Sequence, residues 1–138
     1  MISITRKFEF DAAHRVLGHE NRCRFIHGHR YVAYVTIQAP ELNHLGMVMD
    51  FGLVKELIGK WIDKYWDHNI LLNTDDPLAK TLLETEQREP FFFAKTNPTA
   101  EVIAQALFLA AVDLLSKEMQ VIRVRVYETP NCYADYKP

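Results

Sequence analysis

The spacing of apolar residues changes twice along this chain, and this change limits the folds that the chain can adopt. Residues 2–10 alternate apolar and polar side chains, which indicates a strand. Residues 31–39 are rich in β-branched and aromatic residues and predict a second strand. Residues 54–65 instead repeat an apolar side chain every three or four positions, which indicates an amphipathic helix. Alternation returns at residues 122–127, so the chain must combine a central helical region with strands at both ends.

Capping residues predict where the helices begin. Asp50 precedes the first helical pattern and suits an N-cap position. Asn97 followed by Pro98 indicates the N-cap and first turn of a second helix, whose apolar stripe continues to about Lys117. Residues 67–97, between the two helices, are predicted to be mostly loop with one short helix.

The predicted order is therefore strand, strand, helix, helix, strand, strand, with a short last strand at Tyr133–Lys137. Neighbouring strands would pair antiparallel in a four-stranded sheet with both helices on one face, which makes an α+β domain. The chain length suits a single domain over residues 1–138. Because a four-stranded sheet has two open edges, we expect these edges to pair with other chains in an oligomer.

Charge and composition exclude several classes of partner. The net charge of -2 gives no electrostatic basis for binding nucleic acid or an anionic membrane. No apolar run approaches the roughly 18–20 residues of a membrane helix, and the N-terminus lacks a signal-peptide core. We therefore expect a cytoplasmic protein in which Cys23 and Cys132 are reduced thiols.

Cys23, His27 and His29 form a compact motif at the start of the second strand. Residues two apart in a strand share a face, so both imidazoles can reach one ion. His14 lies at the end of the first strand, and a hairpin would bring it against His27. Three imidazoles with an open fourth position suit a catalytic Zn2+, although the same ligands accept other divalent ions. The alternative is a closed structural site in which Cys23 is the fourth ligand.

Cys23 and an Asp-His pair are the candidates for acid–base chemistry. If Cys23 is not a ligand, its thiol lies near a cation and can act as a general base or nucleophile, although spacing alone slightly favours an inert side chain. Asp67 and His68 are adjacent at the end of the first helix. An imidazole beside a carboxylate suits a general acid or a proton relay.

Glu128 ends the last long strand, and by parity it shares the apolar face with Ile122, Val124 and Val126. A carboxylate on such a face needs a partner. Two partners remain as alternatives. One is a bound ligand with paired N–H donors, and the other is an arginine that forms a salt bridge with Glu128. Cys132 has no predicted partner.

Six segments occur in the order FDAAH, CRFIHGH, VMDFGLVK, WDHNILL, NPTAE and VYET. Together they resemble the 6-pyruvoyl-tetrahydropterin synthase family, including its bacterial 6-carboxytetrahydropterin synthases of queuosine biosynthesis. The matches cover most of the chain, and CxxxHGH with its upstream His and downstream Asp-His is highly specific. The resemblance implies the tunnelling fold, in which sheets from several subunits of a hexamer or tetramer join into a barrel with active sites at the interfaces.

The resemblance also implies a zinc lyase acting on 7,8-dihydroneopterin triphosphate. Zinc would be held by His14, His27 and His29, with Cys23 as the catalytic base. The bacterial branch would yield 6-carboxytetrahydropterin, acetaldehyde and triphosphate, whereas the alternative pyruvoyl-forming branch eliminates triphosphate only. An alternative of another class is a non-catalytic binding module that zinc stabilises.

Five further residues receive roles from the resemblance. Asp67 and His68 would complete the proton relay, including across a subunit boundary. Glu128 would anchor the pterin ring, Thr99 would contact it and Glu101 would support the pocket. Residues 84–97, with three consecutive phenylalanines, look longer than a minimal family loop. They either cover the active-site mouth, pack a subunit interface or form a local hydrophobic clamp.

Overall fold

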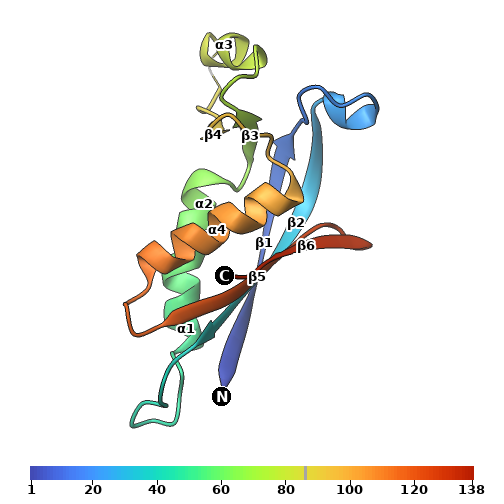
Figure 1. Ribbon diagram of the computed structural model, residues 1–138. Helices are drawn as coiled ribbons and strands as arrows, with labels where there is room; N and C mark the ends of the chain where they lie inside the picture. The colour runs from blue at the N-terminus through green and yellow to red at the C-terminus, as the bar shows by residue number, and fades with distance from the viewer. Residues whose placement is uncertain (86) are drawn as a thin grey trace.

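Figure 1 shows the computed structural model, which describes residues 1–85 and 87–138. The strands form one twisted sheet, and the helices of residues 51–65 and 100–114 pack against one face of it. In chain order the elements are β1 (Ser3–His14), η1 (Arg22–Arg24), β2 (His27–Gln38), α1 (Phe51–Val54), η2 (Lys55–Gly59), α2 (Lys60–Tyr65), β3 (Asn69–Asn73), α3 (Leu78–Leu83), β4 (Phe91–Phe93), α4 (Ala100–Leu114), β5 (Gln120–Thr129) and β6 (Cys132–Tyr136).

The sheet has six strands in the order β4-β3-β1-β2-β5-β6. The pairs β1–β2, β2–β5 and β5–β6 are antiparallel, which confirms the predicted α+β class and the four predicted strands. The predicted count was wrong, because β3 pairs parallel to β1 and β4 pairs parallel to β3. Both extra strands lie within residues 67–97, which were predicted to be loop. A short apolar run without alternation does not distinguish a buried strand from other buried structure.

The helix predicted at residues 54–65 is present and is continuous from α1 through η2 to α2. Asp50 caps it as expected, because its side chain accepts a hydrogen bond from the N–H of Gly52 at 2.6 Å. The buried side chains of Val54, Ile58 and Ile62 form its core-facing stripe. Across the described residues, none of the helices has the length and apolar character needed to cross a membrane.

The second long helix begins later than predicted. Thr99, rather than Asn97, is the N-cap of α4, and its hydroxyl accepts from the N–H of Val102 at 3.3 Å. The side chain of Asn97 bonds instead to the backbone of Leu17. The proline between Asn97 and Thr99 therefore precedes the helix and does not form its first turn.

A bulge changes which residues of β5 face the core. The register shifts between Thr36 and Ile37 of β2, where Ile37 pairs with Val121 and Thr36 with Arg123. As a result Val121 is buried and Ile122 is only partly buried. The alternation in the sequence had instead placed Ile122 on the apolar face. Beyond the bulge, the predicted parity holds for Val124 and Val126, which are fully buried.

The three phenylalanines of residues 84–97 form β4, and two of them, Phe91 and Phe93, belong to an aromatic cluster inside the chain. The ring of Phe91 lies 5.9 Å from those of Trp61 and Trp66, measured between centroids, and 5.2 Å from that of Phe93. This arrangement corresponds to the predicted hydrophobic clamp. One residue of the segment, Glu86, lies outside the described residues.

Candidate active site

The β1–β2 hairpin brings the three candidate ligand histidines together. His14 and His27 are direct partners in the strand register, and Ala12 is the partner of His29. Because positions two apart share a face, all three rings lie on the same side of the sheet. The ring centroids of His14 and His27 are 4.7 Å apart, those of His27 and His29 are 4.8 Å apart, and those of His14 and His29 are 5.1 Å apart.

Glu128, at the end of β5, completes this cluster. One carboxylate oxygen lies 3.1 Å from Nε2 of His29 and 3.9 Å from Nε2 of His14. The potential ligand atoms of Glu128 and the three histidines all lie within 4.8 Å of one another. The carboxylate therefore faces imidazoles, whereas the sequence had offered a bound ligand or an arginine as its partner.

Backbone carbonyls orient two of the rings. Nδ1 of His14 donates to the carbonyl oxygen of Pro98 at 2.6 Å, and Nδ1 of His27 donates to that of Phe25 at 2.8 Å. A carbonyl only accepts, so in a neutral ring Nδ1 carries the hydrogen and Nε2 carries the lone pair. Metal-binding histidines usually hold their second nitrogen in this way.

The free nitrogens of the cluster fit a metal ion. Nε2 of His14 and Nε2 of His29 are buried and form no hydrogen bond within the described part of the chain, although an oxygen of Glu128 lies 3.1 Å from that of His29. Burial lowers the pKa of both rings, and the opposing effect of the Glu128 charge does not overcome it. The rings are thus neutral near pH 7, which is the form that binds a cation.

Cys23 lies in η1, in the connection between β1 and β2 at the end of the hairpin opposite the N-terminus (Figure 1). Its carbonyl accepts from the N–H of Val16 at 2.7 Å, which anchors the turn. Among the described residues, the metal-type clusters do not include its sulfur. Cys23 is partly buried, and neither it nor Cys132 forms a disulfide.

Asp67 and His68 form a second cluster with Asp11. One oxygen of Asp67 is 2.8 Å from Nδ1 of His68, and the other accepts from the backbone N–H of Asp11 at 2.9 Å. Although desolvation opposes ionisation, the Asp11 N–H and the His68 ring hold the pKa of Asp67 below its usual range. His68 has a left-handed backbone, with φ of 56°, and its side chain is 76% exposed. The Asp67 carboxylate therefore orients the His68 ring, which is open to solvent.

The two clusters lie toward different faces of the sheet. His14 is buried on the face that the helices cover. Asp11, three positions earlier in the same strand, directs its carboxylate to the other face, where it accepts from Arg30 at 2.9 Å. The sequence predicted the three histidines and the Asp67–His68 pair. It did not predict that Glu128 and Asp11 join them or that the sheet divides the two clusters.

Thr99 and Glu101 are placed at the start of α4. Thr99 caps the helix, as described above, and Glu101 is exposed in its first turn. Thr99 directly follows Pro98, whose carbonyl holds the His14 ring, so it lies close to the histidine cluster along the chain.

Sequence reasoning missed three groups beside the cluster. The carbonyls of Pro98 and Phe25 carry no side-chain signal, because every residue has a carbonyl. The Tyr31 ring lies 5.5 Å from that of His29, and its hydroxyl is buried without a hydrogen-bond partner in the described residues. Burial raises the pKa of Tyr31, so this hydroxyl remains a donor. The sequence signal for Tyr31 was its position two residues after His29 on the same strand, which places both side chains on one face.

A groove leads from the cluster onto the uncovered face of the sheet. It is lined by residues of β1, β2 and β5 and their ends, among them His29, Arg30, Tyr34, Tyr127 and Glu128. His29 and Glu128 thus contact both the histidine cluster and the groove. A ligand in the groove could reach the cluster through these two residues.

Comparison with known proteins decides the family. The model of the 6-pyruvoyl tetrahydropterin synthase family matches residues 3–138. The chain belongs to this family. A 6-carboxy-5,6,7,8-tetrahydropterin synthase from Rickettsia bellii is 42% identical over 98% of this chain and 99% of its own length. The enzyme of the same name from Aquifex aeolicus is 30% identical over 97% of this chain and 96% of its own length.

Two solved structures resemble the chain over nearly its whole length. An uncharacterized protein from Wolinella succinogenes has a TM-score of 0.83 and 25% identity, covering 99% of this chain and 97% of that chain. The 6-pyruvoyl tetrahydropterin synthase of Caenorhabditis elegans has a TM-score of 0.70 and 24% identity, covering 99% and 95%. The second likeness shows a shared fold.

Proposed function

We propose that this protein is a 6-carboxytetrahydropterin synthase, a lyase that converts 7,8-dihydroneopterin triphosphate and water to 6-carboxytetrahydropterin, acetaldehyde and triphosphate for queuosine biosynthesis. The convergence of His14, His27 and His29, whose possible ligand atoms lie within 4.8 Å of one another, carries the proposal. The 42% identity to a synthase of this name over nearly the whole chain supports the choice of branch.

Zinc is the metal that we propose for the histidine cluster. His14, His27 and His29 would hold it, and three neutral imidazoles suit a catalytic zinc that keeps an open position. Bound zinc would supply Lewis acidity toward the side-chain hydroxyls of the substrate. The protein's own contribution is to hold the rings of His14 and His27 in one tautomer through the carbonyls of Pro98 and Phe25.

Glu128 is proposed to anchor the pterin ring. Its carboxylate belongs to the histidine cluster, and the residue also lines the groove. A carboxylate can accept hydrogen bonds from the amino and ring N–H groups of a pterin. Thr99, near the cluster, is proposed to contact the ring, and Glu101 to support the pocket. Arg30 also lines the groove and offers a cation for the substrate's phosphates.

Cys23 is proposed to remove a carbon-bound proton, with Asp67 and His68 relaying protons. Asp67 fixes the His68 ring through Nδ1 and leaves Nε2 directed away from Asp67. Because the exposed His68 and the buried His14 lie toward different faces of one sheet, we propose that the relay serves the histidine cluster of a second copy. A homo-oligomer joined through the sheet edges β4 and β6 would allow this.

Mass spectrometry of the products tests the function. Purified zinc-loaded protein is incubated with 7,8-dihydroneopterin triphosphate, and the pterin and volatile products are identified. We expect 6-carboxytetrahydropterin and acetaldehyde in equal amounts with triphosphate. A pyruvoyl pterin without acetaldehyde would assign the chain to the other branch, and unaltered substrate would favour a non-catalytic zinc-stabilised module.

A further inference from the structure

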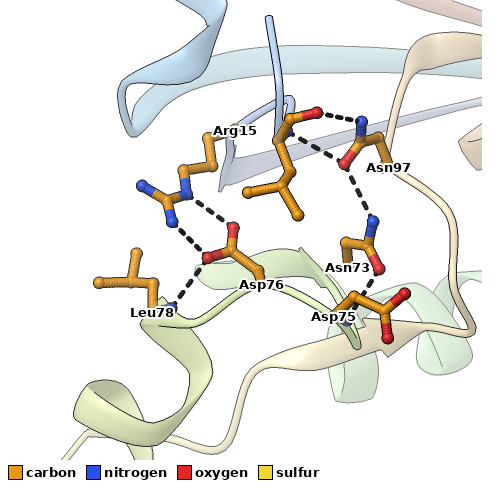
Figure 2. Close-up of polar contacts among 7 residues, drawn as sticks. Arg15, Asn73, Asp75, Asp76, Leu78 and Asn97 are labelled. Atoms are coloured by element: carbon orange, nitrogen blue, oxygen red, sulfur yellow. Dashed lines mark hydrogen bonds and ion pairs between the residues drawn. The ribbon is translucent and has the colours of Figure 1, made fainter.

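The side chain of Asn97 ties together two segments that are far apart in sequence. Its oxygen accepts from the backbone N–H of Leu17 at 3.0 Å, and its nitrogen donates to the carbonyl of Leu17 at 2.9 Å. The same oxygen also accepts from the side chain of Asn73 at 3.2 Å. Figure 2 shows Asn97 between Asn73 of β3 and the segment that follows β1. We call these three residues the Asn97 clamp.

The clamp lies next to the hydrogen bond that orients His14. Pro98, which directly follows Asn97, accepts from Nδ1 of His14, and Leu17 is three residues after His14. The two segments are thus joined by three hydrogen bonds, one of them from the ligand ring itself. Pro98 has no N–H and contributes its carbonyl alone, so the clamp at Asn97 holds the position of that carbonyl.

A separate ion pair fixes the chain immediately after His14. The guanidinium of Arg15 binds both carboxylate oxygens of Asp76, one of them at 2.6 Å, and the Asp76 side chain is fully buried. Asp76 also accepts from the N–H of Leu78 at 2.9 Å at the start of α3 (Figure 2). With this side of His14 anchored, the clamp determines how the Pro98 carbonyl meets the ring.

We infer that Asn97 is a positioning residue for the metal site, which selects the Nδ1–H tautomer of His14 by holding the Pro98 carbonyl against it. This inference rests on the proposed metal site but not on the proposed reaction. Without the clamp, the carbonyl can move away, and Nε2 can take the hydrogen and lose the lone pair that would bind a cation. Partners that orient ligand histidines typically change metal affinity 10–100-fold when they are removed.

Two measurements on Asn97→Ala test the inference, and neither requires turnover. Long-range 1H–15N spectra of the metal-free protein report the tautomer of His14. We expect the Nδ1–H form in the wild type and a mixture with the Nε2–H form in the variant. Competition with a chromophoric chelator reports the Kd for Zn2+, which we expect to rise about tenfold or more in the variant.

Asn43 provides a matched control within the same chain. Its side-chain oxygen accepts from the N–H groups of Leu45 and Met47 at 2.9 and 3.1 Å in an exposed loop. We expect Asn43→Ala to leave both the His14 tautomer and the Kd for Zn2+ unchanged. If the alanine variant does not fold, Asn97→Asp replaces it. The aspartate keeps the acceptor for the N–H of Leu17 but loses the donor to the Leu17 carbonyl, so it too should weaken Zn2+ binding.

An Asn97 variant that folds with a Kd for Zn2+ within twofold of the wild type, or with an unchanged His14 tautomer, would overturn the inference. Failure of the wild type to bind Zn2+ at all would overturn it as well. Tight binding of Zn2+ without synthase products would instead contradict the proposed function and leave the positioning role of Asn97 standing.

Discussion

His14 of β1 faces His27 of β2 as its direct partner in the antiparallel register, with ring centroids 4.7 Å apart. The two rings come from opposite ends of a connection that contains η1 and Cys23. Each ring donates through Nδ1 to a backbone carbonyl, that of Pro98 or that of Phe25. The pairing of the two strand ends therefore brings together two imidazoles whose Nε2 atoms can each donate a lone pair to a metal. His29 and Glu128 complete a four-residue cluster.

Removal of one ligand should abolish stabilisation by metal. We expect Zn2+ at about 100 times its Kd to stabilise the wild type by about 2.7 kcal/mol. His27→Ala should lose most of this gain while keeping the stability of the metal-free fold, since His27 is only partly buried. Thermal unfolding with Zn2+ and with a chelator checks both. His19→Ala, in an exposed loop, is the control, and an equal Zn2+ response in the two variants would contradict the ligand assignment.

Replacement of the thiol should separate metal binding from turnover. We expect Cys23→Ala to retain one Zn2+ per chain, because the sulfur is not part of the histidine cluster. Turnover should fall about 10²–10⁴-fold, which is the usual contribution of a general base. Metal analysis and initial rates measure the two effects. Loss of the metal together with activity would instead support the closed site with Cys23 as a ligand.

His68→Ala should lower kcat far more than it raises KM. The ring is exposed and oriented by Asp67, so its loss removes a proton carrier without disturbing the fold. We expect a reduction in kcat of about 10²-fold or more. Steady-state kinetics with His44→Ala as the exposed control checks this. A variant with a normal kcat and a raised KM would show that His68 only binds substrate.

Glu128→Gln should weaken pterin binding. The amide replaces one of the two acceptor oxygens with an NH2 donor and removes the negative charge. A hydrogen bond to a charged group contributes about 1.5–3 kcal/mol. We expect a rise of about tenfold or more in the Kd of a substrate analogue, measured by pterin fluorescence. Glu56→Gln should bind normally, because the Glu56 carboxylate pairs with the exposed Lys60 along the helix. Equal affinities in both variants would remove Glu128 from the pocket.

The buried ion pair of Arg15 and Asp76 should give the fold an acid-sensitive component. Arg15 holds the pKa of Asp76 below its usual range. A lowered pKa means that the stabilisation is complete above the unfolded value of about 3.9 and is lost as pH falls through the lower folded value. Asp76→Asn should therefore cost about 2–3 kcal/mol at pH 7, and the difference from the wild type should shrink below about pH 4.

Urea unfolding at a series of pH values measures this difference. The similar pair of Arg125 and Asp135 is more exposed, so Asp135→Asn should cost about 1 kcal/mol or less. If the two variants lose equal stability, or if the loss in Asp76→Asn does not diminish in acid, the buried pair does not stabilise the fold as described.

Local patterns were sufficient for much of the fold. Alternation predicted β1, β2 and most of β5, and the 3.6-residue repeat predicted the helix that ends at Tyr65. The loss of alternation at the β5 bulge hid the burial of Val121, because an extra residue in one strand reverses parity. β3 and β4 were missed because their strand character depends on neighbours that are distant in sequence.

The sequence by itself determined which side chains could form a metal site: His27 and His29 share a face because strand parity is a property of adjacent residues, and His14 follows from the hairpin. Only the tertiary structure decided what surrounds that site. The Pro98 carbonyl reaches His14 from 84 positions away, and Asn97 reaches Leu17 from 80 positions away. Such contacts depend on how the whole chain packs, and a backbone carbonyl cannot be recognised in a sequence because every residue has one.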